Sequence, residues 1–482
     1  MPVKTAVTCP VCGTFCDDIE IIVDDNNHII EARNACAMGA AKFLNFADHR
    51  IKTPLIRKNG ELVEATMDEA IEKAAHILVD AHFPILYGWS NTCCEAQRVG
   101  VALAEEVGGV MDNTATVCHG PSILGIQAAG IPSATLGQLR HRADLIIYWA
   151  SNPWDAHPRH PERYTMFSDG RFEKSTWIQY LSKLRGDMSK KKIQRASNLV
   201  LKKDFCFANC ESVGLPCNMY QNKRRTIVVD VRKTRTADAA DCFIQVEPGK
   251  DYELLQALRV LVRDGELDVD EVAGIPKETL EDLADIMISC KLGIIFFGLG
   301  LTMTKGKHLN IDAAINLTRD LNNRTKFLIM PMRGHYNVTG ANIVTTWQTG
   351  YPFAVDLSNG YPRYNPGETS STDILRRDEA DAMLVIASDP VAHFPKAASK
   401  NIAKHPLISI DPEVTPTTML ADVILPPAFA GIEAEGTAYR MDHVPLPLKK
   451  VVEPPEGFLS DQEILRKLLQ KVRELKQKSD VN

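Results

Sequence analysis

Eight short apolar segments recur along the chain, and they constrain its fold more than any other feature. Each is rich in Ile, Val and Leu, ends in Gly, Ser, Asn or Asp, and is followed by a stretch of helical character. Such runs are typical of parallel strands buried on both faces, with helices as crossovers. They lie at 84–91, 143–153, 225–234, 291–300, 326–334, 381–390, 406–413 and 421–427. We therefore predict an α/β protein.

The polar residues that end these segments are candidates for ligand binding. Parallel sheets bind ligands in the crevice outside the carboxyl ends of their strands. A single Gly or Asp at such a place is usually plain turn chemistry. Eight segments that end alike favour a site for one large ligand.

Four cysteines near the N-terminus form a second strong pattern. Cys9, Cys12, Cys16 and Cys36 are spaced C-x2-C-x3-C-x19-C. This spacing is typical of the ligands of a 4Fe–4S cluster, whereas a four-thiolate zinc site usually pairs two C-x2-C motifs. Zinc and unliganded core cysteines are the alternatives. The segment 19–30 (IEIIVDDNNHII) predicts a hairpin that returns Cys36 to the other three.

Composition excludes several classes of protein. A formal net charge of -6 gives no reason to expect nucleic acid as a partner. No apolar stretch reaches transmembrane length, and the start MPVKTAVTCP lacks a signal-peptide core. We therefore expect a cytoplasmic protein without a membrane span. Twelve cysteines in such a chain favour metal or redox chemistry over disulfides.

Other stretches predict local structure. Residues 49–66 resemble a linker, 67–81 predict a helix, and 461–478 predict an amphipathic terminal helix. A basic stretch at about 173–225 interrupts the rhythm of apolar segments. It contains Cys206, Cys210 and Cys217, one thiol short of a closed metal site. We interpret it as a surface insertion, with a second metal site or a docking face for an acidic electron-transfer partner as the alternatives.

One cysteine and one arginine are candidates for catalysis. Cys118 lies beside His119 in a polar loop, DNTATVCHGPSI, that leads into a helix. A thiolate there can bind a soft metal or attack a substrate, and the imidazole can move protons. Arg333 follows the strand segment KFLIMPM, where a guanidinium suits a bidentate grip on a small carboxylate. A buried packing role for Cys118 and a surface ion pair for Arg333 are the alternatives.

Several motifs together resemble a known family. The cysteine module, VVDVRKTRTADAAD with EPGKD, and ILPPAFAGIEAEGTAYR resemble the molybdopterin-dinucleotide oxidoreductases. More specifically, NTATVCHGPS, YWASNPWDAHPRH, PMRGHYNVTGAN and WQTGYPFAVDLSNGYPRYNPGE resemble the B subunit of formylmethanofuran dehydrogenase, which carries molybdenum or tungsten. The resemblance covers nearly the whole chain apart from the insertion.

The resemblance implies roles for particular residues. Cys9, Cys12, Cys16 and Cys36 would hold a 4Fe–4S cluster, and Cys118 would bind tungsten or molybdenum carried by a bis-molybdopterin guanine dinucleotide. His119 and Arg333 would handle the proton and orient formate or CO2. The remaining implied contacts are with the cofactor. Its guanosine end would meet Asp230, Gly249 and Asp251, and its pterin crevice would be lined by Gly88, Trp89, Ser90, Asn152, Gly298, Gly300, Ser388, Asp389 and Asp411.

The resemblance also implies domains and partners. A 4Fe–4S domain would span 1–55, an α/β pterin domain 56–110 with 335–482, and an α/β domain with the Cys118 loop 111–334. The family's terminal β-barrel is missing here, so a small subunit would supply it. An amidohydrolase-like subunit and ferredoxin or polyferredoxin donors would complete the complex. Where many relatives have a lysine after the last cluster cysteine, this chain has Met38, with Lys42 nearby.

The implied activity is that of the catalytic subunit of formylmethanofuran dehydrogenase, an enzyme of methanogenesis in anaerobic archaea. It would reduce CO2 reversibly to formate, with electrons arriving through the cluster. A partner would then condense formate with methanofuran. A formate dehydrogenase subunit and a non-catalytic electron-transfer scaffold are the rival interpretations.

Overall fold

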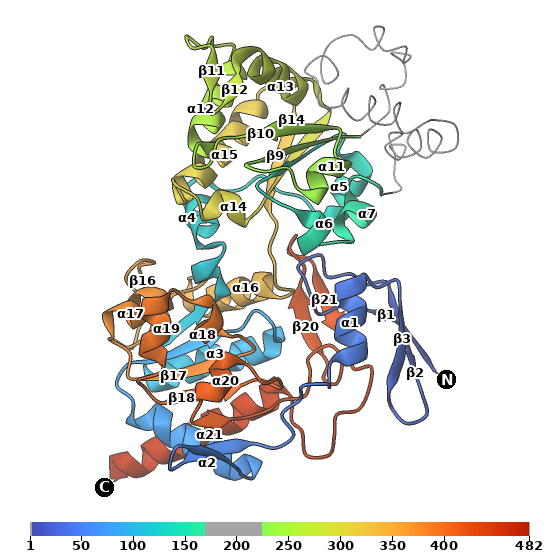
Figure 1. The fold of residues 1–482 in the computed structure, drawn as a ribbon. Helices are drawn as coiled ribbons and strands as arrows, with labels where there is room; N and C mark the ends of the chain where they lie inside the picture. Colours follow the sequence, from blue (N-terminus) through green and yellow to red (C-terminus); the bar gives the residue numbers. More distant parts are fainter. Residues whose placement is uncertain (1, 169–223, 482) are drawn as a thin grey trace. The chain divides into compact units, whose positions relative to one another are not determined.

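The computed structural model describes residues 2–168 and 224–481, which form two compact units (Figure 1). Unit 1 contains residues 1–120 and 333–482, and unit 2 contains residues 121–332. The predicted domain division at 55, 110 and 334 stays a prediction, although the Cys118 loop falls in unit 1. Cys206, Cys210 and Cys217 lie outside the described residues.

Unit 1 is built on a nine-stranded sheet with five parallel central strands. In spatial order these are β7 (Val110–Asn113), β6 (Pro84–Gly88), β17 (Ala382–Ile386), β18 (Leu407–Ile410) and β19 (Val423–Ile424). The chain adds β7 on one side of β6 and the other three strands on the opposite side. The strand order therefore reverses between β6 and β17, which is where doubly wound sheets bind ligands.

Unit 2 repeats this arrangement in a smaller, fully parallel sheet. Its order is β10 (Cys242–Gln245), β9 (Arg225–Asp230), β8 (Leu145–Trp149), β13 (Leu292–Phe297) and β14 (Lys326–Pro331). Here the order reverses between β8 and β13. Each of the eight predicted apolar segments contains one strand of these two sheets, so the α/β prediction is confirmed. The short strands β7 and β10 were not predicted.

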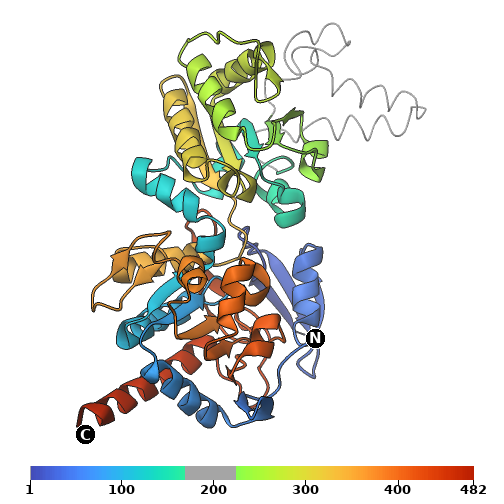
Figure 2. The same ribbon diagram turned by 60° about the vertical axis from the view of Figure 1, so that its left-hand side comes forward.

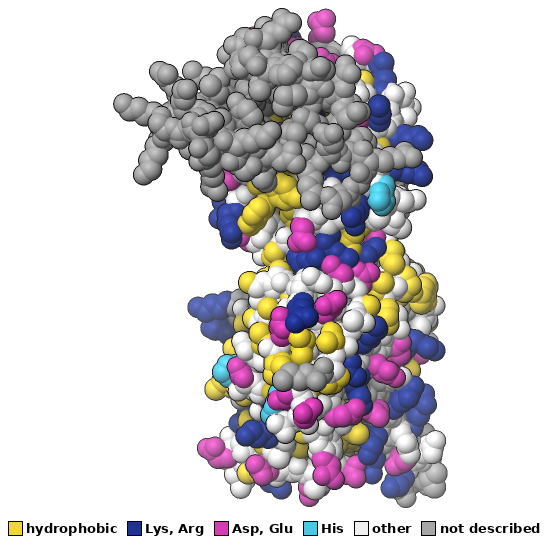
Figure 3. Space-filling view, turned by 90° about the vertical axis from the view of Figure 1, so that its right-hand side faces the viewer, with side chains coloured by type: hydrophobic (Ala, Val, Ile, Leu, Met, Phe, Trp, Pro, Cys, Tyr) yellow, Lys and Arg dark blue, Asp and Glu magenta, His cyan; other side chains and the backbone are white. Residues whose placement is uncertain are grey.

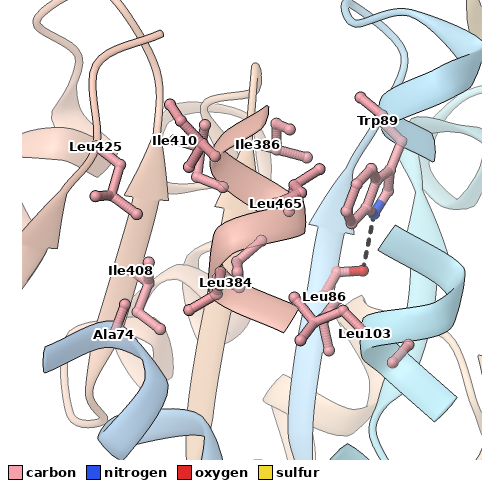
Figure 4. Close-up of a cluster of buried hydrophobic side chains, with 14 of the residues drawn as sticks. Ala74, Leu86, Trp89, Leu103, Leu384, Ile386, Ile408, Ile410, Leu425 and Leu465 are labelled. Carbon is pink, nitrogen blue, oxygen red and sulfur yellow. Dashed lines mark hydrogen bonds between the residues drawn. The ribbon is translucent and has the colours of Figure 1, made fainter. Parts of the chain in front are cut away.

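Helices flank both large sheets, as Figures 1 and 2 show. In unit 1, α21 (Asp461–Val481) packs against both α2 (Met67–Asp80) and α3 (Cys94–Val107). Alternate strand residues such as Leu86, Leu384 and Ile408 face a shared core (Figure 4). The predicted terminal helix is confirmed, because Ile464 and Leu468 are fully buried in this core. Each such side chain contributes about 1.5–3 kcal/mol relative to exposure.

The N-terminal module has a small antiparallel sheet of its own. Strand β1 (Val3–Val7) pairs with β2 (Ile19–Val23), which pairs with β3 (Ile29–Arg33). The β2–β3 pairing confirms the predicted hairpin, whose turn is closed by a bond from the His28 amide to Asp24 Oδ1 at 2.7 Å. Cys36 then precedes α1 (Ala37–Asn45). The hairpin thus returns the chain to the first three cysteines.

The prediction of a linker at 49–66 is wrong. This stretch contains β4 (Leu55–Lys58) and β5 (Glu61–Glu64), an antiparallel hairpin that extends the unit 1 sheet beyond β19. Asn59 and Gly60 form its turn with positive φ angles of 52° and 88°. Asn-Gly is the strongest two-residue hairpin signal. The opposite edge of the sheet is completed by β15 (Val355–Asp356) and β16 (Arg363–Tyr364).

The described surface is mixed in charge. On the face shown in Figure 3, Lys and Arg side chains are interspersed with Asp and Glu side chains. This agrees with the modest formal net charge of -6. Within residues 2–168 and 224–481, no helix combines the length and apolar character needed to cross a membrane.

Candidate active site and cofactor-binding residues

The Cys118 loop is held by a buried carboxylate at the end of β7. Asp112 accepts hydrogen bonds from the Asn113 amide at 2.8 Å, the Ala354 amide at 3.0 Å and the Ser371 amide at 2.8 Å. It also accepts from Thr116 Oγ1 at 2.8 Å, within a 3₁₀ turn that spans Thr114–Val117. These donors compensate for the burial that raises the Asp112 pKa. The loop therefore has a fixed conformation at Cys118.

Cys118 and Arg333 lie close enough in unit 1 for each to shift the pKa of the other. Burial raises the pKa of the Cys118 thiol to about 11, and the Arg333 charge acts in the opposite direction. Burial lowers the pKa of Arg333 to about 10, and Cys118 acts to raise it. Arg333 is only 4% exposed. The structure thus brings together two residues that the sequence proposed separately, and we call them the Cys118–Arg333 centre.

His119 is buried directly after Cys118, at the entry to α4 (Gly120–Ala129). Arg333 Nη1 donates a hydrogen bond to Oδ1 of Asn342, which lies on α16 (Val338–Thr349). Asn342 was not among the residues that the sequence singled out. Asn342 ends the motif PMRGHYNVTGAN, but nothing in that motif assigns it a contact with Arg333.

The cysteine module contacts the segment that carries Arg333. The Gly13 amide donates to the Gly334 carbonyl at 2.9 Å, and Cys12 forms an isolated antiparallel β-bridge with His335. A Cβ on Gly13 would lie 2.1 Å from the Arg333 carbonyl oxygen. Only glycine allows so close an approach of two backbones. Gly13 therefore sets the distance between the cysteine loop and the Cys118–Arg333 centre.

The four module cysteines converge. The Cys9 amide donates to the Cys16 carbonyl at 2.8 Å. A Cβ on Gly39 would lie 3.1 Å from Cys9 Sγ and 3.8 Å from Cys36 Sγ. Burial, followed by the charges of Cys16, Cys12 and Cys36, raises the pKa of Cys9 well above its usual value. A bound cation would relieve this cost.

A cavity of about 600 Å³ lies beside this module within unit 1. It is lined by Met38 and Lys42 of α1 and by Asp411 and Asp461. Lys42 forms an ion pair with Glu413 at 2.8 Å. Burial raises the pKa of both aspartates to about 7.

Asp461 is the member of this cavity that sequence reasoning missed. Its side chain is buried, and Oδ2 accepts a hydrogen bond from Thr92 Oγ1. Among the described residues, its Oδ1 has no hydrogen-bond partner. In the sequence, Asp461 follows a serine at a helix start, which indicates only ordinary capping.

The crevice residues predicted in unit 1 have different surroundings in the structure. The Trp89 side chain faces the core, not a crevice, and its indole N–H donates to the Leu86 carbonyl at 3.1 Å (Figure 4). Gly88 is glycine because a Cβ would lie 2.0 Å from the Ile386 carbonyl oxygen. Ser90 is buried against Thr114, and Asp389 Oδ1 accepts from Thr417 Oγ1 at 2.6 Å. Asp411 lines the cavity, and Ser388 is half-buried at the switch point.

In unit 2, two predicted carboxylates lie together at the ends of β8 and β9. Asp251 accepts a hydrogen bond from Trp149 Nε1 at 2.9 Å. Burial raises the pKa of Asp251, and the charge of Asp230 adds to the shift. Burial also raises the pKa of Asp230. Gly249, with φ +77°, forms the turn before α12 (Asp251–Leu261).

The other residues predicted in unit 2, Asn152, Gly298 and Gly300, contact neighbouring residues of the same unit. Asn152 donates to Asp155 at 2.6 Å and accepts from Thr236 at 2.6 Å. A Cβ on Gly298 would lie 2.3 Å from the Ala150 carbonyl oxygen, and one on Gly300 would lie 2.9 Å from Ala150 Cβ. These two glycines therefore permit tight packing at the switch point between β8 and β13.

Comparisons with known proteins agree with this architecture. The molybdopterin oxidoreductase family profile matches residues 214–471. The chain is 50% identical to the B subunit of tungsten-containing formylmethanofuran dehydrogenase 2 from Methanocaldococcus jannaschii, over 97% of this chain and 98% of the relative. It is 46% identical to the Methanococcus maripaludis protein of the same name, over 99% of this chain and all of the relative.

A solved structure shares the fold. A chain of the formyltransferase/hydrolase complex of Methylorubrum extorquens, determined with methylofuran, superposes with a TM-score of 0.63 at 18% identity, covering 88% of this chain and 99% of that one. The profile match places the chain in the class of molybdopterin oxidoreductases. Within that class, the chain belongs to the family of formylmethanofuran dehydrogenase B subunits.

Proposed function

We propose that this chain is the catalytic redox subunit of a tungsten-containing formylmethanofuran dehydrogenase that interconverts CO2 and formate. The observation that carries the proposal is the Cys118–Arg333 centre, a half-buried thiol and a buried guanidinium that act on each other's pKa near the end of a parallel sheet. A thiolate binds a soft metal, and a guanidinium binds a carboxylate. Together the two groups suit metal-dependent formate chemistry.

The N-terminal module would hold a 4Fe–4S cluster through Cys9, Cys12, Cys16 and Cys36. Two observations support this assignment: Cys9 and Cys36 both lie against Gly39, and the charges of Cys12, Cys16 and Cys36 all raise the pKa of Cys9. Across the part of the chain that the structure describes, no three His, Cys, Asp or Glu side chains are placed to hold one metal ion. The C-x2-C-x3-C spacing suits the wider cluster better than a single zinc ion.

Cys118 would hold the tungsten of a bis-molybdopterin guanine dinucleotide, which supplies the two-electron couple when bound. In unit 1, the cavity beside α1 suits a ring system with N–H donors, because Asp411 and Asp461 present carboxyl oxygens. In unit 2, Asp230 and Asp251 suit the N–H groups of a guanine or the hydroxyls of its ribose. Gly249 lets the backbone approach at that edge.

The chain's own residues would bind and orient the substrate. Arg333 would grip the two oxygens of formate and stabilise negative charge on CO2 as it is reduced. His119, adjacent to Cys118, would hold or move the proton. Burial of both residues excludes water from that exchange.

Partners are part of the proposal. A small subunit would supply a dinucleotide-binding β-barrel, an amidohydrolase-like subunit would join formate to methanofuran, and ferredoxin or polyferredoxin would deliver electrons. The structural similarity to a chain of a multisubunit formyltransferase/hydrolase complex supports an assembly of this kind. We place the complex in the cytoplasm, without nucleic acid or a membrane span.

The test is anaerobic metal analysis of the purified complex. We expect one tungsten per chain and about four irons in this subunit. About eight irons would add a second cluster and leave the catalytic assignment intact. Iron without tungsten or molybdenum would overturn the proposal and leave an electron-transfer scaffold. Bound heavy metal without a hydrolase-like partner would favour a formate dehydrogenase.

A further inference from the structure

A pair of buried amides connects Arg333 to the Cys118 loop. Asn342 is 6% exposed, and its Oδ1 accepts the hydrogen bond from Arg333 Nη1. Its Nδ2 donates to the Pro352 carbonyl at 3.1 Å and to Asn113 Oδ1 at 3.3 Å. The oxygen and the nitrogen of the Asn342 amide are therefore both hydrogen-bonded, and these partners set its orientation.

Asn113 continues the connection to the loop. Its Nδ2 donates to the same Pro352 carbonyl at 3.1 Å. Its Oδ1 accepts from the Ala115 amide at 2.9 Å and so caps the turn that ends at Cys118. One carbonyl oxygen thus binds two side-chain amides, one from the Cys118 loop and one from the residue that holds Arg333.

The chemistry of residue 342 matters as much as its position. An amide offers Arg333 a neutral acceptor, so this contact orients the guanidinium without adding a negative charge. A carboxylate at 342 would form an ion pair with Arg333, and its second oxygen would face the Pro352 carbonyl and Asn113 Oδ1, which accept and do not donate. A shorter side chain would leave Nη1 without this acceptor.

We propose that Asn342 is a positioning residue that aims the Arg333 guanidinium at an anionic substrate while keeping this contact neutral. The inference rests on the proposed function, in which Arg333 binds formate. Asn342 does not touch the reacting atoms in this scheme. It acts through Arg333, and Asn113 joins its position to that of Cys118.

The experiment compares Asn342→Asp and Asn342→Ala with wild type in the purified complex. The readouts are the KM for formate, the inhibition constant of azide as a small monoanion probe, kcat, and tungsten and iron content. For Asn342→Asp we expect both KM and the azide constant to rise about tenfold at unchanged metal content, because the new ion pair competes with the anion. For Asn342→Ala we expect both constants to rise about threefold, because Arg333 keeps its charge but loses the acceptor that orients it.

Asn310→Asp is the matched control. Asn310 is also buried, and its Nδ2 donates to the carbonyls of Leu301 and Lys305 in unit 2. The control places a carboxylate among backbone carbonyls of unit 2, whereas Arg333 belongs to unit 1. Asn310→Asp should therefore leave the azide constant unchanged. Equal rises in both aspartate variants would overturn the proposal, as would an unchanged azide constant in Asn342→Asp with full metal.

If Asn342→Asp fails to fold, Asn113→Ala, Asn342→Ala and their double variant decide. If Asn113 and Asn342 are coupled, the formate KM of the double variant is close to that of the more impaired single variant. Strictly additive effects would overturn the connection. A wild-type complex that binds tungsten and does not oxidise formate would instead refute the proposed function, so the two failures are distinguishable.

Discussion

The two units place different charged groups beyond the same kind of sheet edge, and only unit 1 has a buried guanidinium among its proposed site residues. In each, the strand order reverses beside the first parallel strand, β6 in unit 1 and β8 in unit 2. In unit 1, the residues beyond that edge include a thiol and a guanidinium held by a neutral amide. In unit 2, they are two carboxyl groups and an indole N–H.

Under the proposed function, this difference means that strand order determines where a ligand binds, and that a few buried charges determine which part of it binds. A buried cation selects an anion such as formate. Buried carboxylates select N–H and O–H donors such as a guanine or a ribose. Four substitutions test the comparison, from the largest expected effect to the smallest.

Cys118→Ala should have the largest effect, because it removes the proposed metal ligand. We expect formate oxidation to fall by about 10³-fold or more. Iron content should stay unchanged, since the four module cysteines are intact. Cys290→Ala is the control in unit 2, where a half-buried thiol donates to the Met287 carbonyl. Full activity in Cys118→Ala would remove this residue from the site.

Arg333→Lys tests whether the fork of the guanidinium is needed or only its charge. An ammonium group lacks the planar fork that binds both oxygens of a carboxylate in parallel, and it cannot also reproduce the bond to Asn342 in the same plane. We expect kcat/KM for formate to fall about 100-fold at unchanged tungsten content. Steady-state kinetics in both directions provide the measurement. Unchanged kinetics would mean that formate binds elsewhere.

Asp251→Ala tests the carboxylate edge of unit 2. The variant removes the acceptor of the Trp149 indole and one proposed contact with the guanosine end. We expect tungsten retained after gel filtration to fall about tenfold, with iron unchanged. Asp268→Ala, an exposed aspartate of the same unit, should retain the metal. Equal losses in both variants would argue against a specific contact.

Asp461→Asn should change stability only modestly, and in a pH-dependent way. The folded pKa of Asp461 is raised to about 7 by burial, so wild type loses stability as the pH rises from about 4 to 7. The variant has no proton to lose. Its midpoint of thermal unfolding should exceed that of wild type by about 2–4 °C at pH 8 and converge with it towards about pH 4.

Asp378→Asn provides the opposite sign. Hydrogen bonds from Lys404 and His405 lower the pKa of Asp378 on the surface. The contribution of the Asp378 carboxylate to stability is present above about pH 4 and is lost as the pH falls. At pH 8, Asp378→Asn should therefore be less stable than wild type. A midpoint difference that does not change with pH in Asp461→Asn would show that its carboxyl group is not buried as described.

Much of the fold was predictable because it depends on local composition. The apolar segments are strands wherever they occur, since their length and β-branched residues leave few alternatives. The hairpin after Cys16 followed from two apolar runs around polar turn residues. The β4–β5 hairpin was equally local, and Asn59-Gly60 was the available signal.

The site was predictable only in part. Cys118 and Arg333 were recognised by their motifs, and the structure places them together. Trp89 was misinterpreted, because a residue at a strand end can point to the core or to the crevice. Asp461 carried no signal beyond that of an ordinary cap, and Asn342 lay in the motif PMRGHYNVTGAN without any indication of its contact with Arg333.

The sequence by itself determined eight of the ten parallel strands, the cysteine module and the family, because each depends on residues close together along the chain. Only the tertiary structure decided which polar groups meet. The contact of Gly13 with the Arg333 backbone, and the Pro352 carbonyl shared by Asn113 and Asn342, join segments far apart in the chain. Their geometry is set by packing of the whole unit, and no local pattern encodes a distance between such segments.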